Sequence, residues 1–190
     1  PNRFEAAKEV SKDFISNLGN SSSVGLISYS GSVNQDQDLT DELGLVRSSI
    51  DEITIGETGG TATGDAVASA VSMLTGSKQQ GTVILITDGR NTVGQSLNDS
   101  ADFAQRQNIT VNTIGIGEMN SSTESEEPGL IDGQEATRME FPNLNREGLM
   151  NLSNSTGGES VFVSSREGLE TAFVELEEKE TETDISRWFL

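Results

Sequence analysis

The stretch VILITDGRNT, residues 83–92, joins a run of apolar residues directly to a carboxylate, a glycine and polar side chains. Residues 83–86 form the continuous apolar run that is typical of a strand buried on both faces, in a parallel sheet with helices on each side. Asp88 follows at the carboxyl end of this predicted strand, the edge at which open α/β sheets bind ligands. A second interpretation is that Asp88 and Gly89 only make the turn that leaves the strand.

Helical and strand patterns alternate along the rest of the chain. Apolar residues at spacings of three and four predict helices over 2–18, 43–53, 63–74, 97–107, 145–155 and 165–180. Short apolar runs predict strands over 23–31, 83–87, 109–117 and 160–164, with a short edge strand and turn over 33–42. This alternation predicts an α/β fold with a doubly wound, mostly parallel sheet flanked by helices.

The chain divides into one domain and a short tail. Residues 1–180 form the predicted domain, in which the polar, acidic stretch 118–143 is an irregular excursion. Residues 181–190 are predicted to be a C-terminal stem or juxtamembrane tail, because Trp188, Phe189 and Leu190 follow a charged helix as at the entry to a membrane helix. The alternative is a short apolar tail that docks on the core.

Composition excludes several classes of function. The 190 residues include no Cys and no His, which excludes disulfides, thiol chemistry, zinc sites of the usual nitrogen and sulfur kind, and histidine general bases. Any bound metal must be held by oxygen atoms, which points to magnesium, calcium or manganese. The net charge of −19 repels nucleic acid and anionic membranes.

Four segments, in order, resemble the von Willebrand factor type A (vWA) family over nearly the whole chain. SVGLISYSGSV (23–33) resembles its second strand, GGTATGDAV (59–67) its threonine loop, and VILITDGRNT its fourth strand. ITVNTIGIGE, with the later LMNLSNSTGGESVFVSS, resembles its fifth and sixth strands. Among subtypes the chain most resembles the membrane-anchored prokaryotic aerotolerance (Bat-type) proteins, on the segment GLIDGQEATRMEFPN (129–143) and the acidic C-terminal helix. That resemblance implies a domain at the cell surface, facing outside and tethered through a span outside this chain.

The resemblance implies a metal-ion-dependent adhesion site at the carboxyl edge of the sheet. In the family, a DxSxS motif, a threonine and an aspartate hold a divalent cation that binds an acidic residue of a partner protein. By position, Thr61 matches the threonine and Asp88 the aspartate. A hydroxyl and a carboxylate suit Mg²⁺, or Mn²⁺ or Ca²⁺. The alternatives are that Thr61 only caps the next helix and that Asp88 only ends a strand.

Glycines and polar residues beside the two matched positions are the predicted partner-binding loops. They are Gly59, Gly60, Gly89, Arg90 and Asn91. Glycine lets the loop backbone approach the site closely.

The chain departs from the family at one place, because no DxSxS occurs in its 190 residues. The helix that begins PNRFEAAKEV should follow the first strand that carries this motif. That strand lies between those at 24–30 and 83–87, so two apolar strand edges should be unpaired. Burial of such a strand is worth on the order of 6–15 kcal/mol. We therefore expect a fragment whose first strand is encoded upstream. The alternative is that another strand fills the gap.

These observations predict a non-enzymatic protein-binding and adhesion module. It would bind a protein with an acidic residue through the cation, provided that the missing motif is present in the full protein. The alternatives are a metal-assisted docking subunit of an ATP-driven or chelatase-type complex, and a scaffold with a degenerate metal site. An intrinsic hydrolase is not expected, because the sequence offers no nucleophile–base pair and no P-loop.

Overall fold

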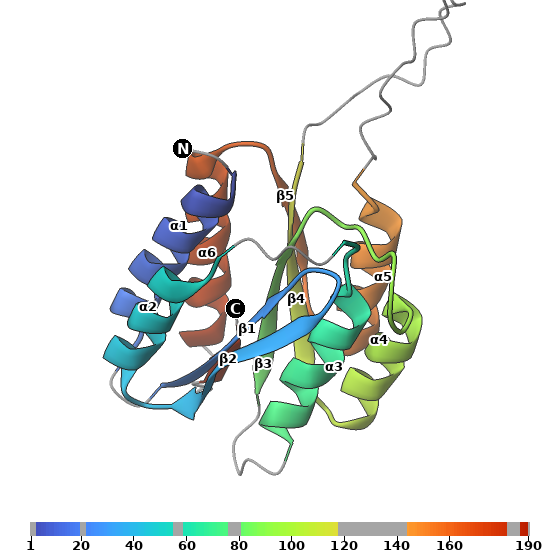
Figure 1. The fold of residues 1–190 in the computed structure, drawn as a ribbon, viewed down its shortest axis with the longest axis horizontal. Coiled ribbons are helices and arrows are strands. Elements are labelled where there is room, and N and C mark those ends of the chain that lie inside the picture. Colours follow the sequence, from blue (N-terminus) through green and yellow to red (C-terminus); the bar gives the residue numbers. More distant parts are fainter. Residues whose placement is uncertain are drawn as a thin grey trace, which may run out of the picture.

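The computed structural model describes residues 3–19, 22–54, 59–75, 81–117, 144–181 and 187–189, and helices cover both faces of its central layer of strands (Figure 1). The helices are α1 (Arg3–Asn17), α2 (Leu43–Glu52), α3 (Thr63–Leu74), α4 (Leu97–Arg106), α5 (Arg146–Thr156) and α6 (Arg166–Thr181). The strands are β1 (Ser23–Tyr29), β2 (Val33–Thr40), β3 (Thr82–Thr87), β4 (Thr110–Ile116), β5 (Ser160–Val163) and β6 (Arg187–Phe189). The predicted α/β fold is confirmed, and the ends of the predicted elements differ from these by a residue or two.

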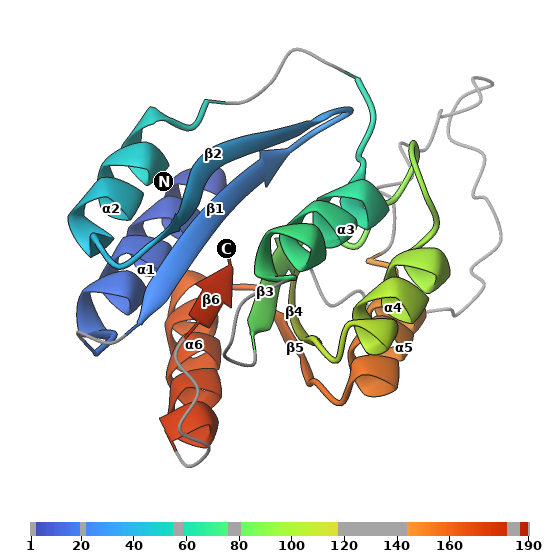
Figure 2. The ribbon, with the colours of Figure 1, turned by 90° about the horizontal axis from the view of Figure 1, so that it is seen from below.

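The strands form two groups of three. In the first, β3, β4 and β5 are parallel neighbours in that order, with Val83 opposite Val111 and Ile114 opposite Val161. In the second, β1 lies between β2, to which it is antiparallel, and β6, to which it is parallel. Helices α1, α2 and α6 lie on one side of this layer and α3, α4 and α5 on the other (Figures 1 and 2).

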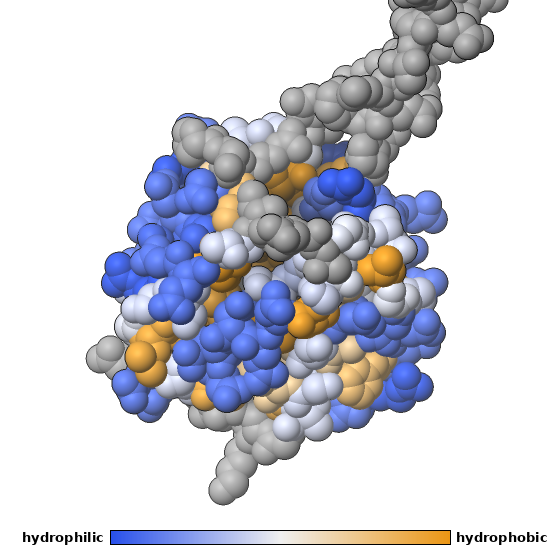
Figure 3. All heavy atoms as spheres, viewed as in Figure 1, coloured by the Kyte–Doolittle hydropathy of each residue, from blue (hydrophilic) through white to orange (hydrophobic). Residues whose placement is uncertain are grey.

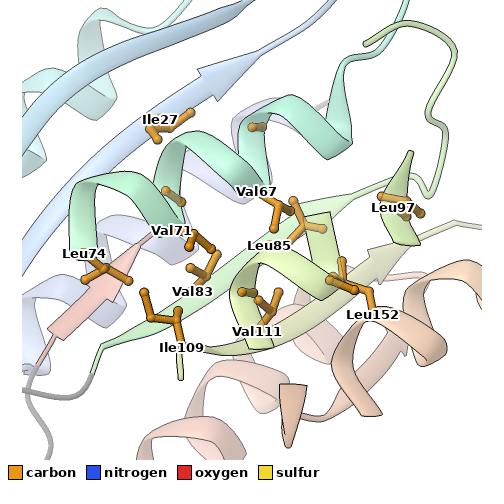
Figure 4. Packing of buried hydrophobic residues seen from close by; sticks show 14 of the residues in the cluster. Ile27, Val67, Val71, Leu74, Val83, Leu85, Leu97, Ile109, Val111 and Leu152 are labelled. Carbon is orange, nitrogen blue, oxygen red and sulfur yellow. The ribbon is translucent and has the colours of Figure 1, made fainter. Parts of the chain in front are cut away.

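Alternation along β3 divides the core into two clusters. Val83 and Leu85 belong to the cluster with α3, α4 and α5, whereas Ile84 belongs to the cluster with α1, α2 and α6. Figure 4 shows Val67 of α3 pointing toward Leu85, and Val71 lying beside Val83. Because successive side chains of a strand point to opposite faces, a continuous apolar run fills both clusters, as the sequence predicted.

The surface is largely polar. On the face drawn in Figure 3, hydrophilic residues cover most of the molecule and apolar ones show only in patches between them. Leu45, Val93, Met150 and Val174 are the large apolar side chains that the described part of the chain leaves exposed. Among the described helices, none combines the length and the apolar character that a membrane crossing requires.

The C-terminal strand β6 corrects one expectation from the sequence. It pairs in parallel with the start of β1, with Val24 opposite Trp188, and lies between β1 and β3 (Figure 2). The edge of β1 is therefore paired over 23–25, where the sequence analysis expected it to be unpaired. Within the tail predicted for 181–190, the structure describes residues 187–189, which are a strand of the sheet. The predicted irregular segment 118–143 lies outside the described residues.

Beyond β6 a cavity of about 390 Å³ separates the carboxyl halves of β1 and β3. Its walls include Leu26 and Ile27 of β1, Ile84 and Ile86 of β3, and side chains of α1 and α3. β6 and this cavity together occupy the place that the sequence analysis assigned to the missing strand, so the alternative that another strand fills the gap holds over residues 23–25 of β1. The rim of the cavity is the carboxyl edge of the sheet, so the candidate site lies at the mouth of this cavity.

Candidate functional site

Two loops bring the predicted ligand residues to the same cavity. Thr61 lies just before α3 and Asp88 just after β3, and both contribute to the cavity lining. The two positions are far apart in the sequence, and they meet because the crossover through α3 returns the chain to the sheet. Both positions therefore lie at the carboxyl edge of the sheet, where the sequence analysis placed them.

The backbone of Thr61 is fixed by the loop that follows β3. Its carbonyl accepts hydrogen bonds from the amides of Thr92 (2.8 Å) and Val93 (3.3 Å), and its own amide donates to the Thr92 hydroxyl (2.9 Å). From the other side, the amide of Ala62 donates to the carbonyl of Ser30 (2.7 Å). The loop before α3 is therefore held between the end of β1 and the loop after β3.

A second set of hydrogen bonds joins the start of α3 to residues 90–95. The Thr63 hydroxyl donates to the Arg90 carbonyl (2.5 Å), and the Asn91 side-chain oxygen accepts from the amide of Gly64 (3.1 Å). The Asn91 side-chain nitrogen donates to the Gln95 carbonyl (2.8 Å), and the Gln95 amide donates to an Asp65 carboxylate oxygen (3.0 Å). These bonds leave little freedom in the relative position of Thr61 and Asp88.

Thr61 does not cap α3. The N-cap residue of α3 is Ala62, and no side chain makes a capping hydrogen bond there. The alternative that Thr61 serves as a helix cap is therefore wrong. Its half-buried hydroxyl remains available at the cavity mouth, as a ligand residue requires.

Asp88 makes a turn and an ion pair with the same neighbour. One carboxylate oxygen accepts from the Arg90 amide (3.2 Å), the local bond by which an aspartate stabilises a turn. The other accepts from Nε and Nη2 of the Arg90 guanidinium, both at 2.7 Å. The Asp88 carboxylate hydrogen-bonds to this guanidinium and so raises the pKa of Arg90. The turn interpretation thus describes part of what Asp88 does, and it leaves a ligand role open.

Two of the predicted loop glycines have a backbone conformation that favours glycine. Gly60 has φ +101° and Gly89 has φ +82°, the left-handed region that side chains disfavour. A Cβ at Gly89 would also lie 2.7 Å from the amide nitrogen of Asn145, at the start of α5. No described atom lies within 4 Å of a Cβ built at Gly59, so the described residues add no steric requirement for glycine there.

Tyr29 closes the cavity mouth between the two groups of strands. Its hydroxyl donates to the carbonyl of Ile86 on β3 (3.2 Å), so the side chain reaches from β1 across the gap. Burial raises the pKa of Tyr29, and hydrogen bonds with Thr87 and Thr63 oppose that shift. Sequence reasoning did not single out Tyr29, although its place at the end of a predicted strand was a usable signal.

The donor set suits a hard cation but does not complete its coordination shell. Asp88 is the one carboxylate among the described residues that line the cavity, and hydroxyls accompany it from Thr61, Thr87, Ser28 and Ser30. In the described ranges no group of three or more Asp, Glu, His or Cys could hold a metal. One carboxylate and hydroxyls fit Mg²⁺ with retained waters, and further protein ligands would have to come from elsewhere.

Comparison with known proteins agrees with this fold. The sequence profile of the von Willebrand factor type A domain matches residues 1–171. A UPF0353 protein of Nocardia farcinica is 27% identical over an alignment that covers all of this chain and 62% of the relative. The UPF0353 protein of Mycolicibacterium gilvum is 26% identical, over 94% of this chain and 54% of that protein. The chain thus spans somewhat more than half the length of these relatives.

Solved structures show the same fold at low sequence identity. BatB from Bacteroides thetaiotaomicron has a TM-score of 0.74 at 23% identity, covering 96% of this chain and 90% of that one. An aerotolerance-related membrane protein from Bacteroides fragilis has a TM-score of 0.72 at 21% identity, covering 94% and 90%. Both are proteins of the kind that the sequence resemblance named. Because the family profile covers most of the sequence, the chain belongs to the von Willebrand factor type A domain family.

Proposed function

We propose that the chain is a non-enzymatic protein-binding module that engages an acidic partner through a divalent cation at the carboxyl edge of its sheet. The observation that carries the proposal is the convergence of Thr61 and Asp88 on one cavity mouth, held by hydrogen bonds between their two loops. Hydroxyl and carboxylate oxygens are the ligands that Mg²⁺, Mn²⁺ and Ca²⁺ accept.

A cation would make this acidic chain attractive to a carboxylate. With a net charge of −19, the surface repels acidic partners at long range. An ion held by one carboxylate and neutral hydroxyls keeps residual positive charge at the rim of the cavity. Support from a fold neighbour comes from the mussel byssus protein PTMP1, solved with a zinc-occupied MIDAS motif (TM-score 0.69, 18% identity, covering 93% of this chain and 40% of that one).

The remaining ligands would come from a segment outside the described residues. A segment that carries DxSxS, entering between β1 and β3, would place its carboxylate and hydroxyls beside Asp88. Such a segment would also cover the apolar walls formed by Leu26 and Ile84. We further propose that the domain is displayed at the cell surface, tethered by a membrane span outside the described residues, as the description of the Bacteroides fragilis neighbour as a membrane protein suggests.

The scaffold alternative rests on a specific observation, the ion pair of Asp88 with Arg90. The Arg90 guanidinium can take the place of a metal cation on the Asp88 carboxylate permanently. The site would then be degenerate, because it would bind no metal. Cation binding separates the two proposals.

The test uses Mn²⁺ alone as a probe, with the protein expressed from its complete gene. Asp88→Asn keeps the size of the side chain and removes its charge, so we expect Mn²⁺ binding by titration calorimetry to be lost. Asp51→Asn is the matched control, because Asp51 is also a carboxylate paired with a cation, Lys12 at 2.6 Å, but lies on α2. Binding that survives in Asp88→Asn would overturn the site.

Thr61 is tested in the same assay. Thr61→Ala removes the hydroxyl and should weaken Mn²⁺ binding without abolishing it, whereas Thr61→Ser keeps the hydroxyl and should bind as the wild type does. Equal affinity of all three proteins would show that Thr61 is not a ligand.

A further inference from the structure

We propose that Arg90 is a built-in competitor of the cation, whose guanidinium holds the Asp88 carboxylate in the cation-free state and must leave it before a cation can bind. This inference rests on the proposed function. It assigns to Arg90 the control of cation affinity at that site.

The contacts of Asp88 carry the first step. Both of its carboxylate oxygens are engaged by Arg90, one by the backbone amide at 3.2 Å and the other by two guanidinium nitrogens at 2.7 Å. A divalent cation needs at least one of these oxygens at about 2.0–2.6 Å. The oxygen turned to the guanidinium cannot bind both positive groups at once. A dication on the other oxygen of the same carboxylate would still lie within a few ångströms of the guanidinium, where the two positive groups repel each other.

The second step is the absence of another carboxylate on the described lining of the cavity. When Arg90 pairs with Asp88, the anionic charge of that lining is neutralised, and Lys8 of α1 adds a positive charge to the lining. A dication that approaches this site meets no net negative charge until the guanidinium turns away. Competition by one arginine therefore matters more here than it would at a site with several acids.

The third step is that release of the guanidinium requires no rearrangement of the backbone. The Arg90 carbonyl accepts the Thr63 hydroxyl and its amide donates to Asp88, so the main chain is anchored on both sides. The Arg90 side chain is 48% exposed and that of Asp88 40%. Rotation of an exposed side chain can open the carboxylate while the two loops keep their place.

The ion pair of Arg90 and Asp88 is exposed and therefore weak, which limits how much its removal can change the affinity for Mn²⁺. Such pairs contribute little when solvent screens them, and here both guanidinium nitrogens contact one carboxylate oxygen, without the two parallel bonds of a bidentate pair. Removal of the guanidinium also removes its repulsion of the dication. We expect Arg90→Ala to bind Mn²⁺ about three- to tenfold more tightly than the wild type.

The experiment titrates Mn²⁺ into the protein expressed from its complete gene. It compares wild type, Arg90→Ala, Arg90→Gln and Arg106→Ala by calorimetry. Arg90→Gln keeps much of the side-chain length without the charge and should match Arg90→Ala, which guards against a variant that folds poorly. Arg106→Ala removes the same charge from the last turn of α4, outside the residues that line the cavity, and should stay within about twofold of the wild type.

Thermal unfolding gives a second readout. Addition of Mn²⁺ should raise the midpoint of Arg90→Ala more than that of the wild type, because tighter binding to the native state stabilises it further. In EDTA the variant should be no more stable than the wild type. If Arg90→Ala were more stable than the wild type in EDTA, the substitution would act on the stability of the fold and not on cation binding, and the inference would be wrong.

The outcomes separate this inference from the function on which it rests. If Asp88→Asn abolishes Mn²⁺ binding while Arg90→Ala binds as the wild type does or more weakly, the cation site stands and the competitor role of Arg90 is wrong. If neither the wild type nor Arg90→Ala binds Mn²⁺, the proposed cation site fails and the inference fails with it.

Discussion

The two groups of strands differ in how completely they are paired. β4 has a parallel neighbour on each side, whereas β1 has β2 along one edge and β6 only opposite residues 23–25 of the other. In the β3–β4–β5 group, β4 pairs with β3 over residues 110–115 and with β5 over residues 113–116. β3 is paired with β4 along its whole length, and its other edge borders the cavity. In the β1 group the last residues before the site face a cavity.

This difference shows what each group contributes. The β3 group supplies a rigid frame that carries Asp88, because a strand buried between two clusters of core side chains cannot shift without a loss of packing. The β1 group lies on the other side of the cavity and is joined to that frame at the carboxyl edge through Tyr29 and the loop that carries Thr61. The candidate site thus spans the gap between the two groups of strands.

The largest expected difference between the two groups of strands is in the hydrogen exchange of their backbone amides. Central amides of β4, such as that of Ile114, should exchange only by global unfolding, while the amides of 26–29 that point away from β2 should exchange at least about 100-fold faster, a difference of about 2.7 kcal/mol in opening free energy. Residue-resolved exchange measured by NMR provides the check, with the β2-facing amide of Ser28, bonded to Asp36, as an internal control. Equal protection of both strands would mean that a strand pairs with β1 along the gap.

Truncation of one core side chain in each group should give a smaller difference, measured as the loss in free energy of unfolding. Ile114 of β4 is fully buried, so Ile114→Ala should lower the free energy of unfolding by about 3–5 kcal/mol. Leu26 of β1 is 3% exposed but borders the cavity, so Leu26→Ala removes fewer contacts and should cost about 2 kcal/mol. Urea unfolding at constant m-value measures both. A cost for Leu26→Ala as large as that for Ile114→Ala would show that the cavity is filled in solution.

The sequence predicted most of the fold because its signals are local. Apolar spacing marks each helix and strand, and the run at residues 83–86 marks a strand buried on both faces. Strand β6 could not be found in this way, because three residues carry no periodicity and their pairing with residues 23–25 joins distant parts of the chain. The prediction of an unpaired edge was wrong there for that reason.

The candidate site was predictable in part. Thr61 and Asp88 lie where the rule for carboxyl edges places them, and two glycines have the backbone conformations that explain their presence. The contacts of Thr63 with the Arg90 carbonyl depend on how two distant loops approach each other, which no local pattern encodes. The pairing of Asp88 with Arg90 is short in range, and the spacing Asp-x-Arg was a signal that the sequence analysis left unused.

The smallest expected effect is a loss of stability at alkaline pH. It depends on the Tyr29 hydroxyl, which joins the two groups of strands through its hydrogen bond to Ile86. Burial raises the pKa of Tyr29, whereas a tyrosine in the unfolded chain titrates near pH 10. Above about pH 10 the unfolded state releases this proton and the native state keeps it, so the free energy of unfolding should fall by at most about 1.4 kcal/mol per pH unit until the native group also titrates. Below that pH the stability that comes from this group is fully present.

Tyr29→Phe isolates that effect. At neutral pH the variant should lose about 0.5–1.5 kcal/mol, the net value of the hydrogen bond to the Ile86 carbonyl, and its stability should then fall less steeply than that of the wild type above about pH 10. Because Tyr29 is the only tyrosine of the chain, tyrosinate absorbance reports on it alone. A native-state transition near pH 10 would mean that water reaches the hydroxyl. In that case Tyr29 would not close the cavity mouth, and the two groups of strands would be joined by their loops alone at this edge.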